Sequence, residues 1–306
     1  MPQLRDVVQD PVLTQVSTAY KNETFLAEQI LPVMPVSKQS GVYFQYDKEN
    51  LRIPASTLRA AGAPAKEVDF SVSKGTFFTQ DHALKEFVPQ EIQDQAMTPT
   101  DPLTDSTENV TEKLLLDKEA AIATYLTSTV NITQNTTLSG TSQWSDYNNS
   151  SPINDIRLAR QTVKLSVGKT PNTLILGQQV FDALADHPEI IERVKYSQLG
   201  VLTTDLLARL FQIKQVWIGE AVYNSAKEGQ SDSLSYVWGK HAILLYIAPT
   251  VKIKQLTFGY TFTYGSRQTE RWTDGDRKGT YVRVHDNYQQ GIVAATAAYL
   301  IKNAIA

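Results

Sequence analysis

Cysteine is missing from all 306 residues of this chain. Its absence excludes disulfide bonds, thiolate nucleophiles and cysteine-ligated zinc sites, so stability must come from non-covalent contacts or other cross-links. Long apolar runs are missing too, since no stretch approaches the ~20 apolar residues that a membrane-spanning helix needs. The first residues, MPQLR, lack the basic and apolar regions of a signal peptide. These absences predict a soluble protein that is made in the cytoplasm and enters no membrane.

The motifs of common enzyme families are absent as well. The chain contains no Gly-x-Ser-x-Gly nucleophile motif, no Gly-x-x-x-x-Gly-Lys-Ser/Thr phosphate loop and no Gly-x-Gly-x-x-Gly dinucleotide motif. None of the four histidines lies at a His-Glu-x-x-His or other metal-ligand spacing. These histidines are His82, His187, His241 and His285. We therefore predict that the protein is not an enzyme, with no catalytic residue, no cofactor and no metal site.

One charged segment, residues 272–279 (WTDGDRKG), invites a metal-site interpretation. Asp274-Gly275-Asp276 could begin a calcium-binding loop, but the glutamate that completes such a loop is missing at the required spacing. A charged turn between two strands is therefore favoured. Basic residues cluster nearby: Arg267, Arg271, Arg277 and Lys278. They either solvate a hairpin or face phosphate or the acidic patch of a neighbour.

Overall composition is that of an ordinary globular protein, with 42% hydrophobic and 20% charged residues. The formal net charge is −3 at pH 7. This balance does not predict tight nucleic-acid binding through a basic face.

The N-terminal segment, residues 1–36, carries apolar residues at regular intervals, which is too many for a solvated tail. Residues 24–30 fit a short helix, and Pro32 and Pro35 force an extended path after it. The segment could pack on the core of its own chain as a first helix and strand. It could also be an arm, because 35 extended residues reach on the order of 115 Å and could lie across neighbouring subunits.

A long two-stranded excursion follows. Residues 41–46 and 68–78 read as strands rich in aromatic and β-branched residues, and about twenty residues with turn formers connect them. An isolated two-stranded ribbon is marginally stable in water, so a ribbon of this length needs another surface to lie on.

The strongest helix prediction covers residues 101–128. Asp101 can cap it, Pro102 suits its first position, and Val110 and Leu114 begin an apolar stripe. We expect Lys113, Asp117, Lys118 and Glu119 to fill the other, solvated face. A second unit follows, with a helix from Pro152 that ends at Gly168, further short helices, and strands such as 173–176, 215–218 and 242–248. The pattern predicts an α+β fold, and we favour a strand over a helix for the apolar tail 291–305.

Several strings of residues resemble the major capsid proteins of tailed bacteriophages, which have the Hong Kong 97-type fold. The resemblance begins at LAEQILPVMPV, residues 26–36, and continues at GVYFQYDK, residues 41–48. It returns further along the chain in the same order as in the family. These later strings are residues 87–89, 110–116, 171–177, 180–184 and 238–240.

The resemblance implies a division of the chain into parts with assigned roles. The expected parts are an N-terminal arm (1–36), an extended β-hairpin loop overlapping an adjacent subunit (37–80), a peripheral domain (81–149) with the spine helix 101–128, an axial domain (150–250), and a return to the peripheral sheet with a C-terminal strand (251–306).

The implied function is self-assembly into hexamers and pentamers of an icosahedral shell around double-stranded DNA. The implied partners are scaffolding and portal proteins, decoration proteins in some relatives, and packaged DNA through weak non-specific contacts. The expected location is the virion capsid, assembled in the cytoplasm of the host bacterium. The family also joins some subunits through Lys–Asn isopeptide bonds, but no reactive pair is identifiable among the loop lysines here.

Two other functions remain open. The same fold could form an encapsulin-like compartment that holds an enzyme cargo. Alternatively, the chain could be an α/β enzyme, for which a pocket with His241 or His285 beside paired carboxylates would be the sign.

Overall fold

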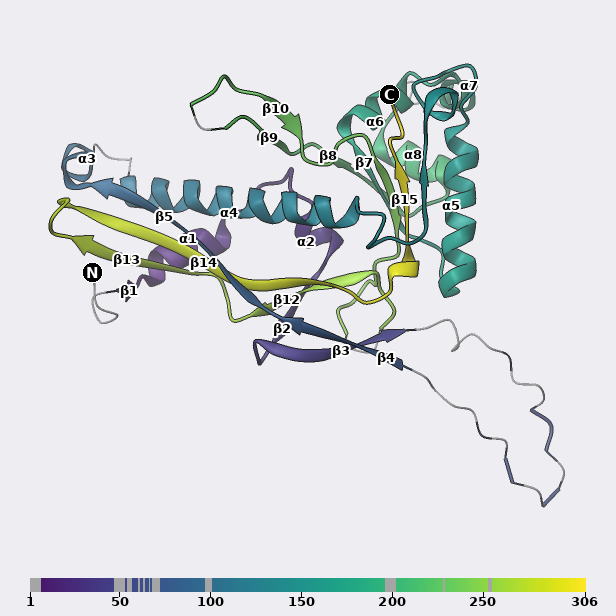
Figure 1. Ribbon diagram of the computed structural model, residues 1–306, viewed down its shortest axis with the longest axis horizontal. Helices are drawn as coiled ribbons and strands as arrows, with labels where there is room; N and C mark the ends of the chain where they lie inside the picture. The colour runs from purple at the N-terminus through teal and green to yellow at the C-terminus, as the bar shows by residue number, and fades with distance from the viewer. Residues whose placement is uncertain are drawn as a thin grey trace.

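The computed structural model describes residues 7–46, 72–96, 101–195, 202–227, 229–252 and 255–306, with scattered positions between 53 and 67. Figure 1 shows an elongated first sheet with one long helix along it, and a second sheet with its own helices at one end. Antiparallel pairing predominates and the helices are segregated around the sheets, which confirms the predicted α+β class.

The long helix α4 (Pro102–Leu126) confirms the prediction for 101–128. The Asp101 carboxylate accepts a hydrogen bond from the amide of Leu103 at 3.2 Å and caps the helix. Val110 and Leu114 pack against Val284 of the first sheet. The prediction of a solvated face was wrong for Lys118 and Glu119, which are 3% and 0% exposed. Their burial is explained by the ionic and hydrogen-bonding partners described below.

The first sheet has six strands among the described residues. Strand β14 is its centre: it pairs with β13 and β12 along one side and with β5 along the other. Between residues 280 and 288 its even-numbered residues, such as Val282 and Val284, are buried beneath α4, and its odd-numbered residues lie half-buried on the other face. The strands are β1 (Val8–Gln9), β2 (Val33–Val36), β5 (Gln80–Pro89), β12 (Gly259–Tyr264), β13 (Gln268–Asp274) and β14 (Gly279–Ile292).

The second sheet has five strands in the described part of the chain, in the order β6-β15-β11-β7-β8. Strands β7 and β11 are buried at every residue, because apolar side chains cover both faces of the sheet. The strands are β6 (Asn135–Thr137), β7 (Thr173–Gly177), β8 (Gln215–Gly219), β11 (Ala242–Leu245) and β15 (Ala298–Lys302). The helices are α5 (Pro152–Val167), α6 (Gln178–Ala185), α7 (Pro188–Val194) and α8 (Thr204–Phe211), with single turns of 3-10 helix at Gly140–Ser142 and Ala295–Ala297.

The predicted C-terminal strand exists, but it joins the second sheet rather than the first. Strand β15 pairs with β11 and β6, whereas β12, β13 and β14 of the predicted 251–306 segment lie in the first sheet. Leu300 and Ile301 are 0% and 1% exposed, so this strand needs apolar cover on both faces. The helix-covered second sheet provides that cover.

The N-terminal segment packs on its own chain, which is the first of the two alternatives. It contains α1 (Pro11–Ala19), α2 (Ala27–Ile30) and β2, and β2 pairs in parallel with β12. Ile30 and Leu31 are fully buried in the core cluster that also contains the end of α4 and the base of the second sheet. These residues therefore belong to the folded body.

The two hairpins project from the body (Figure 1). Strands β3 (Ser40–Tyr46) and β4 (Val72–Phe78) confirm the predicted excursion, although most residues of its connection lie outside the described part. Its base rests on Phe262, whose ring lies 4.5 Å from Phe77 and 5.1 Å from Tyr43 between centroids. The smaller hairpin is β9 (Val222–Asn224) with β10 (Leu234–Tyr236), and a short helix α3 (Gln90–Gln95) follows β5.

Candidate functional site

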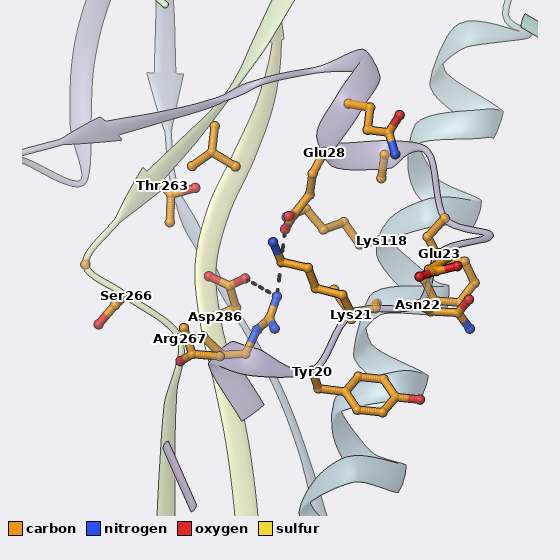
Figure 2. Close-up of a pocket in the computed structure, with 17 residues that line it drawn as sticks. Tyr20, Lys21, Asn22, Glu23, Glu28, Lys118, Thr263, Ser266, Arg267 and Asp286 are labelled. Carbon is orange, nitrogen blue, oxygen red and sulfur yellow. Dashed lines mark hydrogen bonds and ion pairs between the residues drawn. The ribbon is translucent and has the colours of Figure 1, made fainter. Parts of the chain in front are cut away.

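The N-terminal segment, α4 and the turn between β12 and β13 enclose a cavity of about 640 Å³ (Figure 2). Charged side chains from these three elements and from β14 point into it: Glu28, Lys118 and Arg267, and Asp286 of β14. The cavity therefore lies where the first 36 residues are held against the rest of the molecule.

Ion pairs connect these four side chains. Lys118 Nζ lies 3.0 Å from Glu28 Oε1, and Arg267 Nη2 lies 3.6 Å from Asp286 Oδ2 and 3.9 Å from Glu28 Oε1. Burial tends to raise the pKa of Glu28, but Lys118, Arg267 and Lys21 outweigh it and hold that pKa below its ordinary value. A buried charge without a partner is strongly destabilising, so the pairing of Lys118 is needed for the fold.

Glu119, the next residue on α4, connects three parts of the chain. Its carboxylate accepts hydrogen bonds from the amides of Leu26 and Ala27, at 3.0 and 2.7 Å, and from Trp238 Nε1 at 2.7 Å. Burial raises the pKa of Glu119, and these hydrogen bonds act against the rise. The carboxylate thus ties the start of α2 and the segment before β11 to the long helix.

The burial of Glu119 was not predicted from the sequence, although a signal for it was present. Glu119 occupies a position in the apolar series Leu115, Ile122 and Leu126, at the three- and four-residue spacing of one helix face. A carboxylate at such a position predicts a buried hydrogen-bonding role.

The cavity offers little for catalysis. Its described lining includes no histidine, and Glu28, Lys118, Arg267 and Asp286 are paired with one another. Arg267 Nε and Asp286 Oδ1 lack a hydrogen-bond partner among the described residues, so water can occupy the space beside them. The arrangement fits a structural anchor for the N-terminal segment.

His187 contacts a serine hydroxyl, with its Nε2 3.1 Å from Ser150 Oγ. This pairing resembles that of a histidine base and a serine nucleophile. Its Nδ1 accepts a hydrogen bond from the amide of Glu189, so the neutral ring carries its proton on Nε2 and donates to Ser150. Ser150 in turn donates to the carbonyl of Asp146. A histidine in this tautomer cannot take a proton from the serine, and it serves instead as the cap of α7.

The other histidines do not share one site, and His82 and His285 lie on opposite faces of the neighbouring strands β5 and β14. His82 stacks on Tyr288, and His241 Nδ1 accepts a hydrogen bond from the amide of Asn303. His285 Nδ1 lies 3.3 Å from Asp81 and Nε2 lies 3.7 Å from Glu270, on the half-buried face of the first sheet. His285 thus lies between two carboxylates, but neither His285 nor His241 lines the cavity described above.

The segment with Asp274 and Asp276 is a turn between β13 and β14, which confirms the prediction of a charged turn between two strands. Asp274 Oδ1 accepts hydrogen bonds from the amides of Asp276 and Arg277, which closes the turn locally. No group of three or more histidine and carboxylate residues in the described ranges is placed to hold a metal ion.

The nearby basic residues do not form one patch. Arg267 lines the cavity, Arg271 Nε pairs with Asp10 at 2.9 Å, and Arg277 donates to the hydroxyl of Tyr281.

The helices of the described segments include none that is long and apolar enough to cross a membrane.

Comparison with known proteins decides the family. The family model for phage major capsid protein E matches residues 123–232. The major capsid protein of Pseudomonas phage JBD67 is 33% identical to this chain over 306 residues, covering 97% of each protein. The chain belongs to the phage major capsid protein family. Its location in a phage is therefore the virion capsid.

Solved structures agree with this assignment. A phage-related protein from Bordetella bronchiseptica matches with a TM-score of 0.79 and 27% identity, covering 97% of this chain and 98% of that one. The capsid of the cyanophage P-SCSP1u matches with a TM-score of 0.62 at 10% identity, covering 93% and 89%. The fold of this phage capsid protein is the Hong Kong 97 type, as the resemblance implied.

Proposed function

We propose that many copies of this capsid protein form hexamers and pentamers of a closed icosahedral shell around the double-stranded DNA of a tailed phage. The observation that carries this proposal is the 33% identity with a phage major capsid protein along the whole chain. Exposed apolar side chains on both hairpins, including Val42, Phe78 and Leu234, add support because contacts between copies would cover them.

We also propose that the first sheet and α4 make up the peripheral domain and the second sheet the axial domain. The corresponding divisions are 1–36, 37–80, 81–149, 150–250 and 251–306, with β6 and β15 contributed to the axial sheet from outside 150–250. In this proposal the 37–80 loop overlaps an adjacent subunit, and the segment 1–36 contributes shell contacts from the surface of α1.

The proposed partners are scaffolding and portal proteins, decoration proteins, and packaged DNA, with assembly in the host cytoplasm. Contact with DNA would be weak and independent of sequence, because a net charge of −3 gives little attraction for phosphates. We propose no catalytic role, cofactor or metal. The wrong tautomer of His187 and the paired charges of the cavity support a purely structural role.

Electron microscopy of the purified protein, alone and with a co-expressed scaffolding protein, tests the proposal. We expect shells or capsomers. A compact monomer at high concentration under both conditions would contradict the assembly function. Shells that contain an enzyme cargo and no DNA in the producing cell would instead support the encapsulin-like alternative, which the identity with a phage protein disfavours.

A further inference from the structure

The hairpin β9–β10 carries an apolar face that no described part of the chain covers. Its strands pair only with each other among the described residues, and the register sets Tyr236 opposite Val222 and Leu234 opposite Asn224. Directly opposite and alternate residues share a face, so Val222, Leu234 and Tyr236 lie on the same side. Their exposed fractions are 47%, 74% and 36%. Because a lone two-stranded hairpin is marginal in water, this face needs a surface to cover it.

Helix α5 presents a matching surface. Leu158 and Leu165 are seven residues apart, hence on one side of the helix, and are 49% and 84% exposed. The opposite side of α5 is used already, since Ile156 and Val163 are buried in the core. The outer side of α5, named here the Leu158–Leu165 stripe, carries these two leucines with the exposed polar residues Gln161 and Thr162 between them. It faces away from the core of its own chain.

The charges around the two surfaces are complementary. Arg157, Lys164 and Lys169 are exposed beside the α5 stripe, and no acidic residue is exposed between 152 and 170. Among the described residues of the hairpin, two exposed side chains are acidic, Glu220 and Asp232, and one is basic, Lys227. Opposite net charges favour contact between the two patches and disfavour contact of either patch with a copy of itself.

The β9–β10 hairpin and α5 lie on opposite sides of the second sheet (Figure 1). One chain therefore cannot bring its own hairpin onto its own α5. Two copies can, and a contact between two different patches of identical copies repeats head to tail and closes a ring when the rotation allows.

We propose that the β9–β10 hairpin of one copy covers the Leu158–Leu165 stripe of α5 in the next copy, around each ring of the shell. This inference rests on the proposed shell function and specifies which surfaces of the subunit meet. The partner is a second copy of this chain.

The absence of cysteine allows a direct test by cross-linking. Leu165→Cys and Leu234→Cys are placed in the same chain, and assembled particles are treated with a short bismaleimide and separated on a denaturing gel. We expect a ladder up to the ring size from the double variant. Each single variant should remain monomeric on the gel, and particles mixed from the two single variants should stop at dimers.

A matched control pairs Leu234→Cys with Ile92→Cys. Ile92 is also an exposed apolar residue, at 54%, but it lies on α3 at the far end of α4, and this pair should give no ladder. Dimers from a single variant would indicate a symmetric contact and overturn the proposal. Intact particles of the double variant without a ladder would overturn it as well, while leaving the shell function in place.

Charge reversal gives a second test that does not depend on introduced cysteines. Lys164→Glu or Asp232→Lys alone should reduce the yield of particles, and the two together should restore it. Reduced yield without restoration would contradict the charge complementarity. A wild-type protein that stays monomeric would overturn both this contact and the proposed function.

Discussion

The carboxylate of Glu119, in the second half of α4, lies 2.7 Å from the indole nitrogen of Trp238, just before the strand β11 of the second sheet. The same carboxylate holds the amides of Leu26 and Ala27. A single buried side chain thus links the N-terminal segment, the long helix and the second sheet of this capsid protein.

Removing that carboxylate should be strongly destabilising. Glu119→Ala leaves three buried donors without an acceptor, and we expect a loss of roughly 3–5 kcal/mol in the free energy of unfolding. Urea unfolding of the unassembled protein measures this loss. Glu108→Ala is the matched control, because Glu108 is exposed on the same helix, and it should change stability by less than about 0.5 kcal/mol. Equal effects of the two substitutions would contradict the assigned role of Glu119.

His187 should make stability depend on pH. Burial lowers the pKa of His187, against the opposing effect of Glu189, and its Nδ1 must stay unprotonated to accept the amide of Glu189. As the pH falls below the ordinary histidine value of ~6.5, the unfolded chain takes up a proton that the folded chain refuses, so stability decreases. The stabilising contribution is complete above that value.

His187→Asn keeps a side-chain acceptor for the cap but removes the titration. Thermal unfolding at several values between pH 7 and pH 5 should show a shallower loss of stability for this variant than for the wild type. Parallel curves for the two proteins would assign the acid sensitivity to other groups.

The aromatic contact under the large hairpin should fix β3 and β4 on the body. Phe77 stacks on Phe262 at 4.5 Å, whereas its neighbour Phe78 is 58% exposed. We expect Phe77→Ala to raise amide hydrogen exchange in β3 and β4 and leave β7 and β11 unchanged, since local opening then costs less free energy. Phe78→Ala, the control, should leave exchange in the hairpin near the wild-type level.

Deleting residues 50–66 should impair shell formation and leave the core folded. The strands on either side, β3 and β4, pair with each other and rest on Phe262, so the core does not depend on the connection. Circular dichroism should match the wild type while electron microscopy shows few or no shells. Normal assembly of the deletion variant would mean that this loop makes no essential contact between subunits.

By itself, the sequence determined the local elements. Asp101 and Pro102 start α4, Gly168 ends α5 in a left-handed conformation, and alternating apolar residues mark the strands. These features depend on neighbours within a few residues, so periodicity and capping suffice to predict them. The sequence alone also contained the strings of residues that resemble the phage capsid family, in the same order as in that family.

Only the tertiary structure decided where these elements pack. The burial of Lys118 and Glu119 depends on Glu28, Leu26 and Trp238, which lie about 90 to 119 positions away along the chain. The choice of sheet for β15 depends on β11, and the packing of the N-terminal segment depends on α4 and β12. Helix periodicity can indicate that Glu119 is buried, but it does not identify the partners of such a residue, because the fold alone brings those partners together.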